Sequence, residues 1–66
     1  MRIRLNGEDQ EFEGPLDVRG LLTRLGLEPA KIAVERNLEI VPRSQYGATA
    51  LVEGDRLEIV QFIGGG

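Results

Sequence analysis

The end of the sequence is the feature that most limits what this chain can form. Residues 56–63 are rich in β-branched and aromatic side chains and begin as a polar–apolar alternation, which is typical of a β-strand. Three glycines follow at positions 64, 65 and 66, and the sequence stops there. Glycine brings no side chain to a core and loses the most backbone freedom on ordering. We therefore expect a packed domain over residues 1–63 and a flexible tail over residues 64–66.

The composition excludes most enzymatic chemistry. The 66 residues include no cysteine and no histidine, so the chain lacks a thiolate nucleophile, a zinc–thiolate site and the commonest general base. We therefore expect a protein that is not an enzyme on its own and that binds no cofactor or metal. Eleven acidic residues against eight basic ones give a net charge of -3, which argues against a nucleic-acid partner. The sequence shows neither a membrane-length apolar run nor a signal-peptide pattern, so we expect no membrane partner and a cytoplasmic location.

The N-terminal part of the chain is predicted to form a β-hairpin. Apolar and basic side chains alternate over residues 1–5, and Asn6-Gly7 follows at once. This dipeptide favours a two-residue turn, because both of its positions need positive φ. Such a turn pairs Leu5 with Glu8. The second strand, about residues 9–13, is acidic and is expected to be a short, exposed edge strand.

One helix is predicted after Gly14-Pro15 breaks the second strand. Asp17 stands at the N-cap position, where its carboxylate accepts from the free amides of the first turn. Gly26 is placed to end the helix in the left-handed conformation, with Leu27 folding back as in a Schellman motif. The helix therefore covers about eight or nine residues. Its apolar face has the spacing i, i+3, i+4 and i+7 and consists of Val18, Leu21, Leu22 and Leu25.

The second half of the chain is predicted to consist mainly of strands. Residues 31–36 and 39–41 form two short strands around Asn37-Leu38. Residues 43–47 form a turn or a single helical turn, which Tyr46 holds to the body. A lone helix has to cover one face of a sheet, and the crossover favours adjacent first and last strands. We therefore predict an α+β protein with the β-grasp (ubiquitin-like) fold. Its mixed sheet has four to five strands, with one main helix on one face and the final strand in the centre.

The sheet face away from the helix is predicted to contain docking residues. If Leu57 faces the helix, alternation puts Val60 and Phe62 on the other face, where an exposed apolar pair beside the tail is a candidate docking patch. Arg2 and Arg4 share this face if the first strand adjoins the last, and they would steer the protein towards an acidic partner. The alternatives are that a bulge returns Val60 and Phe62 to the core, and that both arginines are ordinary solvated charges.

Two carboxylates near the last strand are candidates for acid–base chemistry or metal binding. Glu53 and Asp55 flank Gly54 in a predicted turn. The sequence predicts no pocket that would desolvate them, and a carboxyl needs such an environment to serve as an acid at neutral pH. We therefore expect neither function at this turn.

Three stretches of the sequence resemble the small sulfur-carrier proteins of thiamine biosynthesis (ThiS-like), within the group of ubiquitin-like sulfur carriers. A terminal Gly-Gly alone is a weak signal, but it is specific when joined to a Gly-Asp turn and an alternating strand. The resemblance covers essentially the whole chain. The three stretches are Leu5-Asn6-Gly7, the segment from Val34 to Arg43 that ends in Ile40-Val41-Pro42-Arg43, and the segment from Glu53 to Gly66.

The resemblance implies a reaction cycle at the C-terminus. A partner enzyme uses ATP to adenylate the carboxylate of Gly66. Sulfur from a donor protein then replaces the adenylate to give a thiocarboxylate, which is handed to a thiazole synthase. Gly64 and Gly65 would form the arm that threads into the partner's site. The third glycine departs from the family pattern, which two glycines satisfy.

The residues leave three other functions open. The small subunit of molybdopterin synthase uses the same tail chemistry for a different product. A ubiquitin-like modifier would be joined through Gly66 to lysines of other proteins. A plain β-grasp interaction module would have an inert tail.

Overall fold

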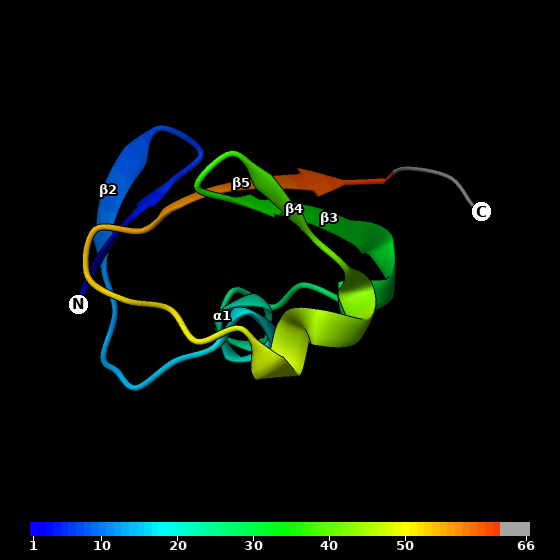
Figure 1. Ribbon diagram of the computed structural model, residues 1–66, viewed down its shortest axis with the longest axis horizontal. Helices are drawn as coiled ribbons and strands as arrows, with labels where there is room; N and C mark the ends of the chain where they lie inside the picture. Colours follow the sequence, from blue (N-terminus) through cyan, green and yellow to red (C-terminus); the bar gives the residue numbers. More distant parts are fainter. Residues whose placement is uncertain (63–66) are drawn as a thin grey trace.

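A five-stranded mixed sheet forms one layer of the protein, and the helix α1 lies across one of its faces (Figure 1). The computed structural model describes residues 1–62, so Ile63 and the predicted tail of Gly64, Gly65 and Gly66 lie outside the described residues. The predicted α+β, β-grasp fold is confirmed. The strands are β1 (Arg2–Leu5), β2 (Glu8–Glu11), β3 (Ile32–Arg36), β4 (Glu39–Val41) and β5 (Arg56–Gln61), and the helix is α1 (Val18–Arg24).

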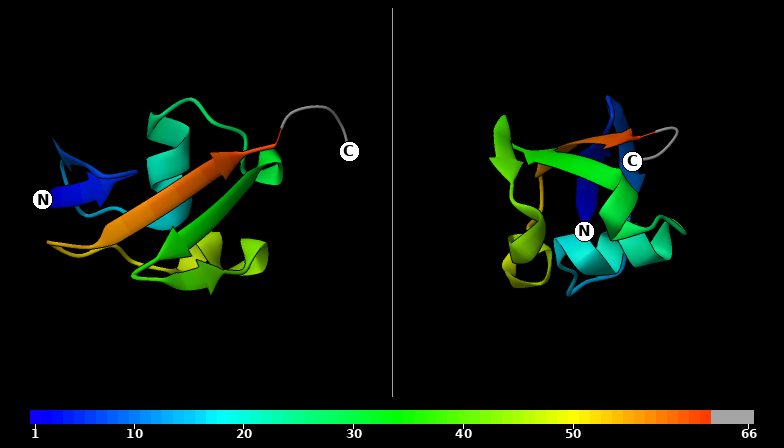
Figure 2. Two further views of the ribbon diagram at one scale, coloured as in Figure 1. Left: turned by 90° about the horizontal axis from the view of Figure 1, so that it is seen from above. Right: turned by 90° about the vertical axis from the view of Figure 1, so that its right-hand side faces the viewer.

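The strand order places β5 in the middle of the sheet. The order is β2-β1-β5-β3-β4, with β5 parallel to β1 and antiparallel to β3. Figure 2 shows β5 between the blue N-terminal strand and the green strand β3. This is the predicted arrangement, and it gives β5, the last strand among the described residues, a neighbouring strand on each side.

The N-terminal hairpin has the predicted turn and register. Asn6 and Gly7 both have positive φ, at 49° and 85°, and Leu5 lies opposite Glu8. The second strand was predicted too late in the sequence, because it covers Glu8–Glu11 rather than residues 9–13. A two-residue turn starts the pairing at Glu8, and β1 offers no partner beyond Met1, whose carbonyl accepts from the Phe12 N–H at 2.8 Å. All four residues of β2 are exposed, as expected for an acidic edge strand.

The start of α1 explains why a glycine is tolerated inside the helix. Asp17 is the N-cap, and its Oδ1 accepts from the Gly20 N–H at 2.7 Å. A Cβ at Gly20 would lie 3.1 Å from Leu16 Cδ1 and 3.2 Å from Asp17 Oδ1. The capping side chain and Leu16 therefore occupy the space that a larger residue would need.

The end of α1 is the predicted Schellman motif. Gly26 has a φ of 75° and donates to the Thr23 carbonyl at 3.0 Å, while Leu27 donates to the Leu22 carbonyl at 2.9 Å. The helix has seven residues, slightly fewer than predicted. The difference arises because Leu25 is already the C-cap rather than part of the helix.

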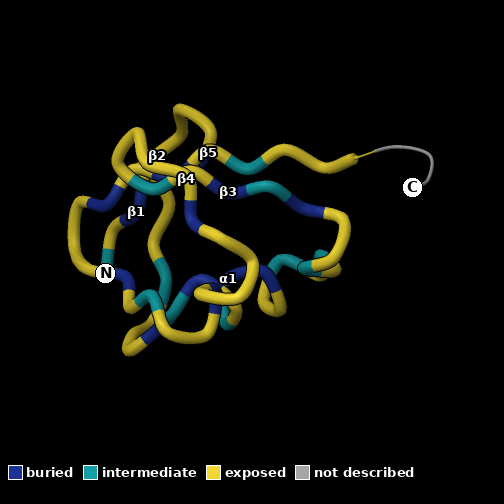
Figure 3. The backbone as a smooth tube through the Cα atoms, turned by 45° about the vertical axis from the view of Figure 1, so that its right-hand side comes forward, coloured by how far each residue is buried: buried dark blue, intermediate teal, exposed yellow. Residues whose placement is uncertain are grey.

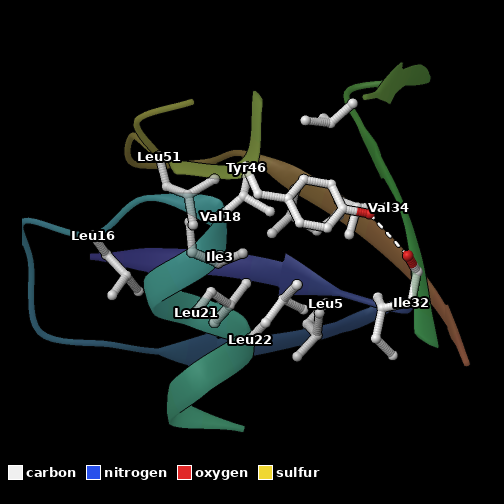
Figure 4. Close-up of a cluster of buried hydrophobic side chains, with 12 residues drawn as sticks. Ile3, Leu5, Leu16, Val18, Leu21, Leu22, Ile32, Val34, Tyr46 and Leu51 are labelled. Carbon is white, nitrogen blue, oxygen red and sulfur yellow. Dashed lines mark hydrogen bonds between the residues drawn. The ribbon is translucent and has the colours of Figure 1, made fainter. Parts of the chain in front are cut away.

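Between α1 and β5 the chain follows the predicted order, with one short 3₁₀ helix added and a second where a turn or a single helical turn is predicted. The first, η1 (Pro29–Lys31), takes Lys31 out of the predicted third strand. The second, η2 (Arg43–Ala48), contains the buried Tyr46. The Tyr46 hydroxyl donates to the Ile32 carbonyl at 2.9 Å (Figure 4), so the predicted attachment of this segment to the body is confirmed.

The core lies between α1 and the inner face of the sheet (Figure 4). All five strands except the edge strand β2 contribute to it, together with α1 and η2. The buried side chains are Ile3, Leu5, Leu16, Val18, Leu21, Leu22, Ile32, Val34, Val41, Tyr46, Leu51 and Leu57.

Within residues 1–62, no helix has the length and apolar character needed to cross a membrane.

Candidate functional site

Val60 near the end of β5 and Phe62 just after it present apolar side chains on the outer face of the sheet. Leu57 is fully buried and Ile59 packs against the core, whereas Val60 is 57% exposed and Phe62 is 55% exposed. The alternation predicted from the sequence is therefore confirmed, and Val60 and Phe62 do not return to the core. Both residues lie just before the part of the chain that carries the predicted reactive position, Gly66.

One further apolar residue shares this face. Glu35 of β3 lies opposite both Glu58 of β5 and Ile40 of β4, so these three side chains point to the same side of the sheet. Ile40 is 78% exposed. The sequence predicts only a short strand at residues 39–41. The side of the sheet on which Ile40 lies depends on the β3–β4 register, which the sequence does not predict.

The predicted basic residues lie on the same outer face but at the other end of β5. Arg4 is exposed and lies opposite Arg56 in the parallel β1–β5 pair, and Arg2 points to the same side two residues earlier. Arg2 Nε forms an exposed ion pair with Glu11 at 3.4 Å. Arg4 and Arg56 line a shallow groove of about 330 Å³ with Gly7 and Glu58. The outer face thus has charged side chains at the start of β5 and exposed apolar side chains at its end. Figure 3 shows the path of β5 coloured by burial, with exposed stretches in yellow.

Asp55 is not the solvated turn carboxylate that the sequence predicts. Its side chain is only 3% exposed. Its carboxylate accepts from Arg36 Nε at 2.9 Å and Nη2 at 3.3 Å, from Asn37 Nδ2 at 3.0 Å and from the Val52 N–H at 2.9 Å. These donors are distant in sequence or part of the backbone, so no local pattern indicates the burial.

The environment of Asp55 keeps its carboxyl charged. Burial acts to raise the pKa of the Asp55 carboxyl, but the hydrogen bonds from Val52, Arg36 and Asn37 and the Arg36 charge outweigh it. The pKa therefore lies below its usual value of 3.8. A carboxylate that is ionised and fully hydrogen-bonded is suited to joining two turns rather than to acid–base chemistry.

Side-chain amides from both hairpin turns bind β5 on opposite edges. Asn6 Oδ1 accepts from the Ile59 N–H at 2.7 Å, and its Nδ2 donates to the Ile59 carbonyl at 3.2 Å. Asn37 Oδ1 accepts from the Arg56 N–H at 2.9 Å. Both asparagines have positive φ. The sequence predicts Asn6 only as a turn residue, and its contact with a strand 53 positions later has no signal in the sequence.

Comparison with known proteins gives one consistent family. The model of the ThiS family matches residues 3–66. The sulfur carrier protein ThiS of Bacillus subtilis is 37% identical over 65 residues, covering 97% of this chain and 98% of that protein. The crystal structure of the thiamine biosynthesis protein ThiS from Geobacter metallireducens has a TM-score of 0.85 and 33% identity, and the match covers 100% of both chains.

A second group of relatives is much longer than this chain. A thiazole synthase of Paramagnetospirillum magneticum is 53% identical over 66 residues, and a thiazole synthase of Magnetococcus marinus is 52% identical over 66 residues. Each match covers 100% of this chain, and the chain spans only 20% of the length of either protein.

Proposed function

Because the chain belongs to the ThiS family, we propose that it is a sulfur carrier for thiamine biosynthesis whose reactive group is the carboxylate of Gly66. The observation that supports this most directly is the extent of the family match, which runs from residue 3 to Gly66 and so includes the glycines. The protein supplies the carboxylate and a docking surface, and partner enzymes supply the catalytic groups.

The proposed cycle starts from an ionised α-carboxylate, whose reference pKa is about 3.3–3.7. Such a carboxylate is a poor electrophile. A partner enzyme joins one of its oxygens to the α-phosphorus of ATP and releases pyrophosphate, which makes AMP the leaving group. A donor protein then delivers sulfur at the oxidation level of sulfide, AMP leaves, and the thiocarboxylate of Gly66 forms.

The glycines and the folded body have separate roles in this proposal. Three residues extend by at most about 10 Å, so the body has to dock close to the mouth of the partner's site. Ordering the arm costs about 1–2 kcal/mol per residue in backbone entropy. Contacts made by the body must offset that cost, and the exposed Val60 and Phe62 are placed to make them.

We assign the receiver of the sulfur to a thiazole synthase. Two proteins named thiazole synthase contain a stretch that is more than half identical to this chain over all 66 residues. A carrier domain and a synthase in one polypeptide indicate that the two act in consecutive steps. ATP is consumed by the adenylating enzyme in this scheme, and the carrier itself binds no cofactor.

Replacing Phe62 by alanine is expected to raise the KM of the adenylating enzyme for this protein about tenfold, because an aromatic anchor at an interface contributes about 1–3 kcal/mol. The kcat should change much less, since the reacting carboxylate is untouched. ATP–pyrophosphate exchange measured against carrier concentration gives both constants. Val52→Ala is the matched control, because Val52 is 53% exposed, close to the 55% of Phe62, but precedes β5. Equal KM values for the wild type and both variants would show that Phe62 is not part of the docking surface.

The proposed function is tested by genetic rescue of a bacterial strain that lacks its own sulfur carrier for thiazole. We expect this chain to remove the strain's requirement for thiazole when the cognate adenylating enzyme is co-expressed. The same plasmid should not restore molybdoenzyme activity to a strain that lacks the small subunit of molybdopterin synthase. Rescue of the second strain but not the first would indicate that the chain serves molybdopterin synthesis and not thiazole formation.

A further inference from the structure

We propose that Asn6 is a positioning residue for the reaction at Gly66, because its side-chain amide fixes the path of β5 at Ile59. This inference rests on the proposed function of Gly66. The contact is with Ile59 of β5, which lies three positions before Phe62. The side-chain bonds from Asn6 to β5 go beyond what a turn requires.

The side chain of Asn6 continues the hydrogen-bond ladder between β1 and β5 beyond Leu5, where β1 ends. On the β1 side of β5, the Arg4 N–H donates to the Asp55 carbonyl at 2.9 Å and the Asn6 N–H donates to the Leu57 carbonyl at 2.9 Å. The next position along is Ile59. There the Asn6 side chain provides both the acceptor, at 2.7 Å, and the donor, at 3.2 Å. The amide thus stands in for the peptide group that a longer β1 would supply.

Asparagine is suited to this place for two physical reasons. The turn requires a φ of 49° at position 6, which asparagine tolerates better than most residues. The primary amide also has the same donor and acceptor pair as a peptide bond. Aspartate offers no donor, and glycine satisfies the backbone but offers neither group. The turn alone would accept glycine, so the amide has a separate use.

The position of this contact connects it to the proposed chemistry. β1 and β5 pair only at Arg4 with Arg56 and at Leu5 with Leu57, so Asn6 supplies the last support on this edge before Val60. The bonds are exposed to solvent, and water competes with such bonds for stability. Their larger effect is therefore on geometry. A small displacement of a reacting group lowers the rate of a positioned reaction strongly.

The first test is structural and independent of any partner. Asn6→Gly keeps the positive φ and removes the amide, and Asn37→Gly makes the same change on the other edge of β5. We expect amide hydrogen exchange at Ile59 to become about fivefold faster in Asn6→Gly, the factor that matches one lost hydrogen bond. In Asn37→Gly the acceleration should appear at Arg56 instead. Unchanged exchange at Ile59 in Asn6→Gly would overturn the proposal.

The second test measures adenylation by ATP–pyrophosphate exchange with the cognate enzyme. We expect kcat to fall about tenfold in Asn6→Gly because the carboxylate is misplaced. KM should rise less than in Phe62→Ala, since Val60 and Phe62 shift with β5 but keep their side chains. Asn37→Gly should keep the wild-type kcat although it loses more stability, because Asn37 also supports Asp55. Asn6→Asp, which retains the acceptor for the Ile59 N–H, should recover part of the rate.

The outcomes separate the inference from the function on which it rests. If wild-type protein is adenylated and Asn6→Gly matches it in kcat, Asn6 is only a turn residue and the proposal is wrong. A fall in kcat that is equal in Asn37→Gly would assign the effect to stability and would also overturn it. If wild-type protein itself is not adenylated by an active enzyme, the proposed function fails, while the exchange data still report whether Asn6 holds Ile59.

Discussion

Replacing Asp55 by asparagine is expected to lower the free energy of unfolding by about 2–4 kcal/mol, because it leaves charged and polar donors facing a new donor inside the fold. The carboxylate accepts four hydrogen bonds, from Arg36, Asn37 and Val52. It is 3% exposed, whereas the Arg36 side chain is 30% exposed and retains some contact with water. Folded domains have roughly 5–15 kcal/mol of stability in total, so the loss is large.

Urea or thermal unfolding followed by circular dichroism measures this effect. Glu53→Gln is the matched control, because Glu53 lies on the other side of Gly54 and is exposed. Glu53 Oε1 accepts from the Arg2 N–H at 2.9 Å, and glutamine retains an acceptor there. Its unfolding free energy should stay within about 0.5 kcal/mol of wild type. If both variants lost equal stability, the Asp55 cluster would have no special part in the fold.

The same cluster predicts how stability depends on pH. The lowered pKa of the Asp55 carboxyl means that the folded protein takes up this proton less readily than the unfolded chain. Its contribution is therefore complete above about pH 4, the unfolded value, and is lost as the pH falls through the lower folded value. The difference in unfolding free energy between wild type and Asp55→Asn should narrow in that acid range. A constant difference down to pH 2 would contradict the assignment.

Local patterns in the sequence were sufficient for the order of the strands and the helix and for the face on which Val60 lies, but not for the 3₁₀ helix η1 or the bounds of β2. Asn6-Gly7 sets the hairpin register because only a two-residue turn fits its backbone preferences. Asp17 and Gly26 mark the two ends of the helix because their backbone and side-chain requirements are local. The central place of β5 followed from topology, since one crossover helix leaves few arrangements for a small mixed sheet.

Contacts between distant residues could not be predicted in the same way. Asp55 was expected to be solvated, yet Arg36 and Asn37 meet it across the sheet through side chains whose reach no local pattern reports. The bonds from Asn6 to Ile59 likewise depend on the register of two strands that are 53 residues apart. Asp55 and Asn6 are both residue types that are common in turns. The predicted turns therefore explained them without any contact to a distant residue. The predicted roles of Gly64, Gly65 and Gly66 stay predictions, since those residues lie outside the described part of the chain.

Deleting Gly66 is expected to reduce the kcat/KM of adenylation by at least about a hundredfold, the effect of misplacing a reacting group by an ångström or more. One residue fewer withdraws the carboxylate by about 3.3–3.6 Å when the arm is extended. The stability of the body should be unchanged, because glycine contributes no side chain to the core. ATP–pyrophosphate exchange measures the rate, and Gly66→Ala, which keeps the length, serves as the control. A deletion variant that is adenylated at the wild-type rate would exclude Gly66 as the reacting residue.

The intact mass of the protein tests sulfur carriage most directly. Wild-type protein incubated with its adenylating enzyme, ATP and a sulfur donor should gain the mass that corresponds to replacing one oxygen by sulfur, and fragmentation should place the change on Gly66. Omitting ATP should prevent it. An unchanged mass in the presence of an enzyme that is active on another carrier, or a sulfur located anywhere other than Gly66, would contradict the account.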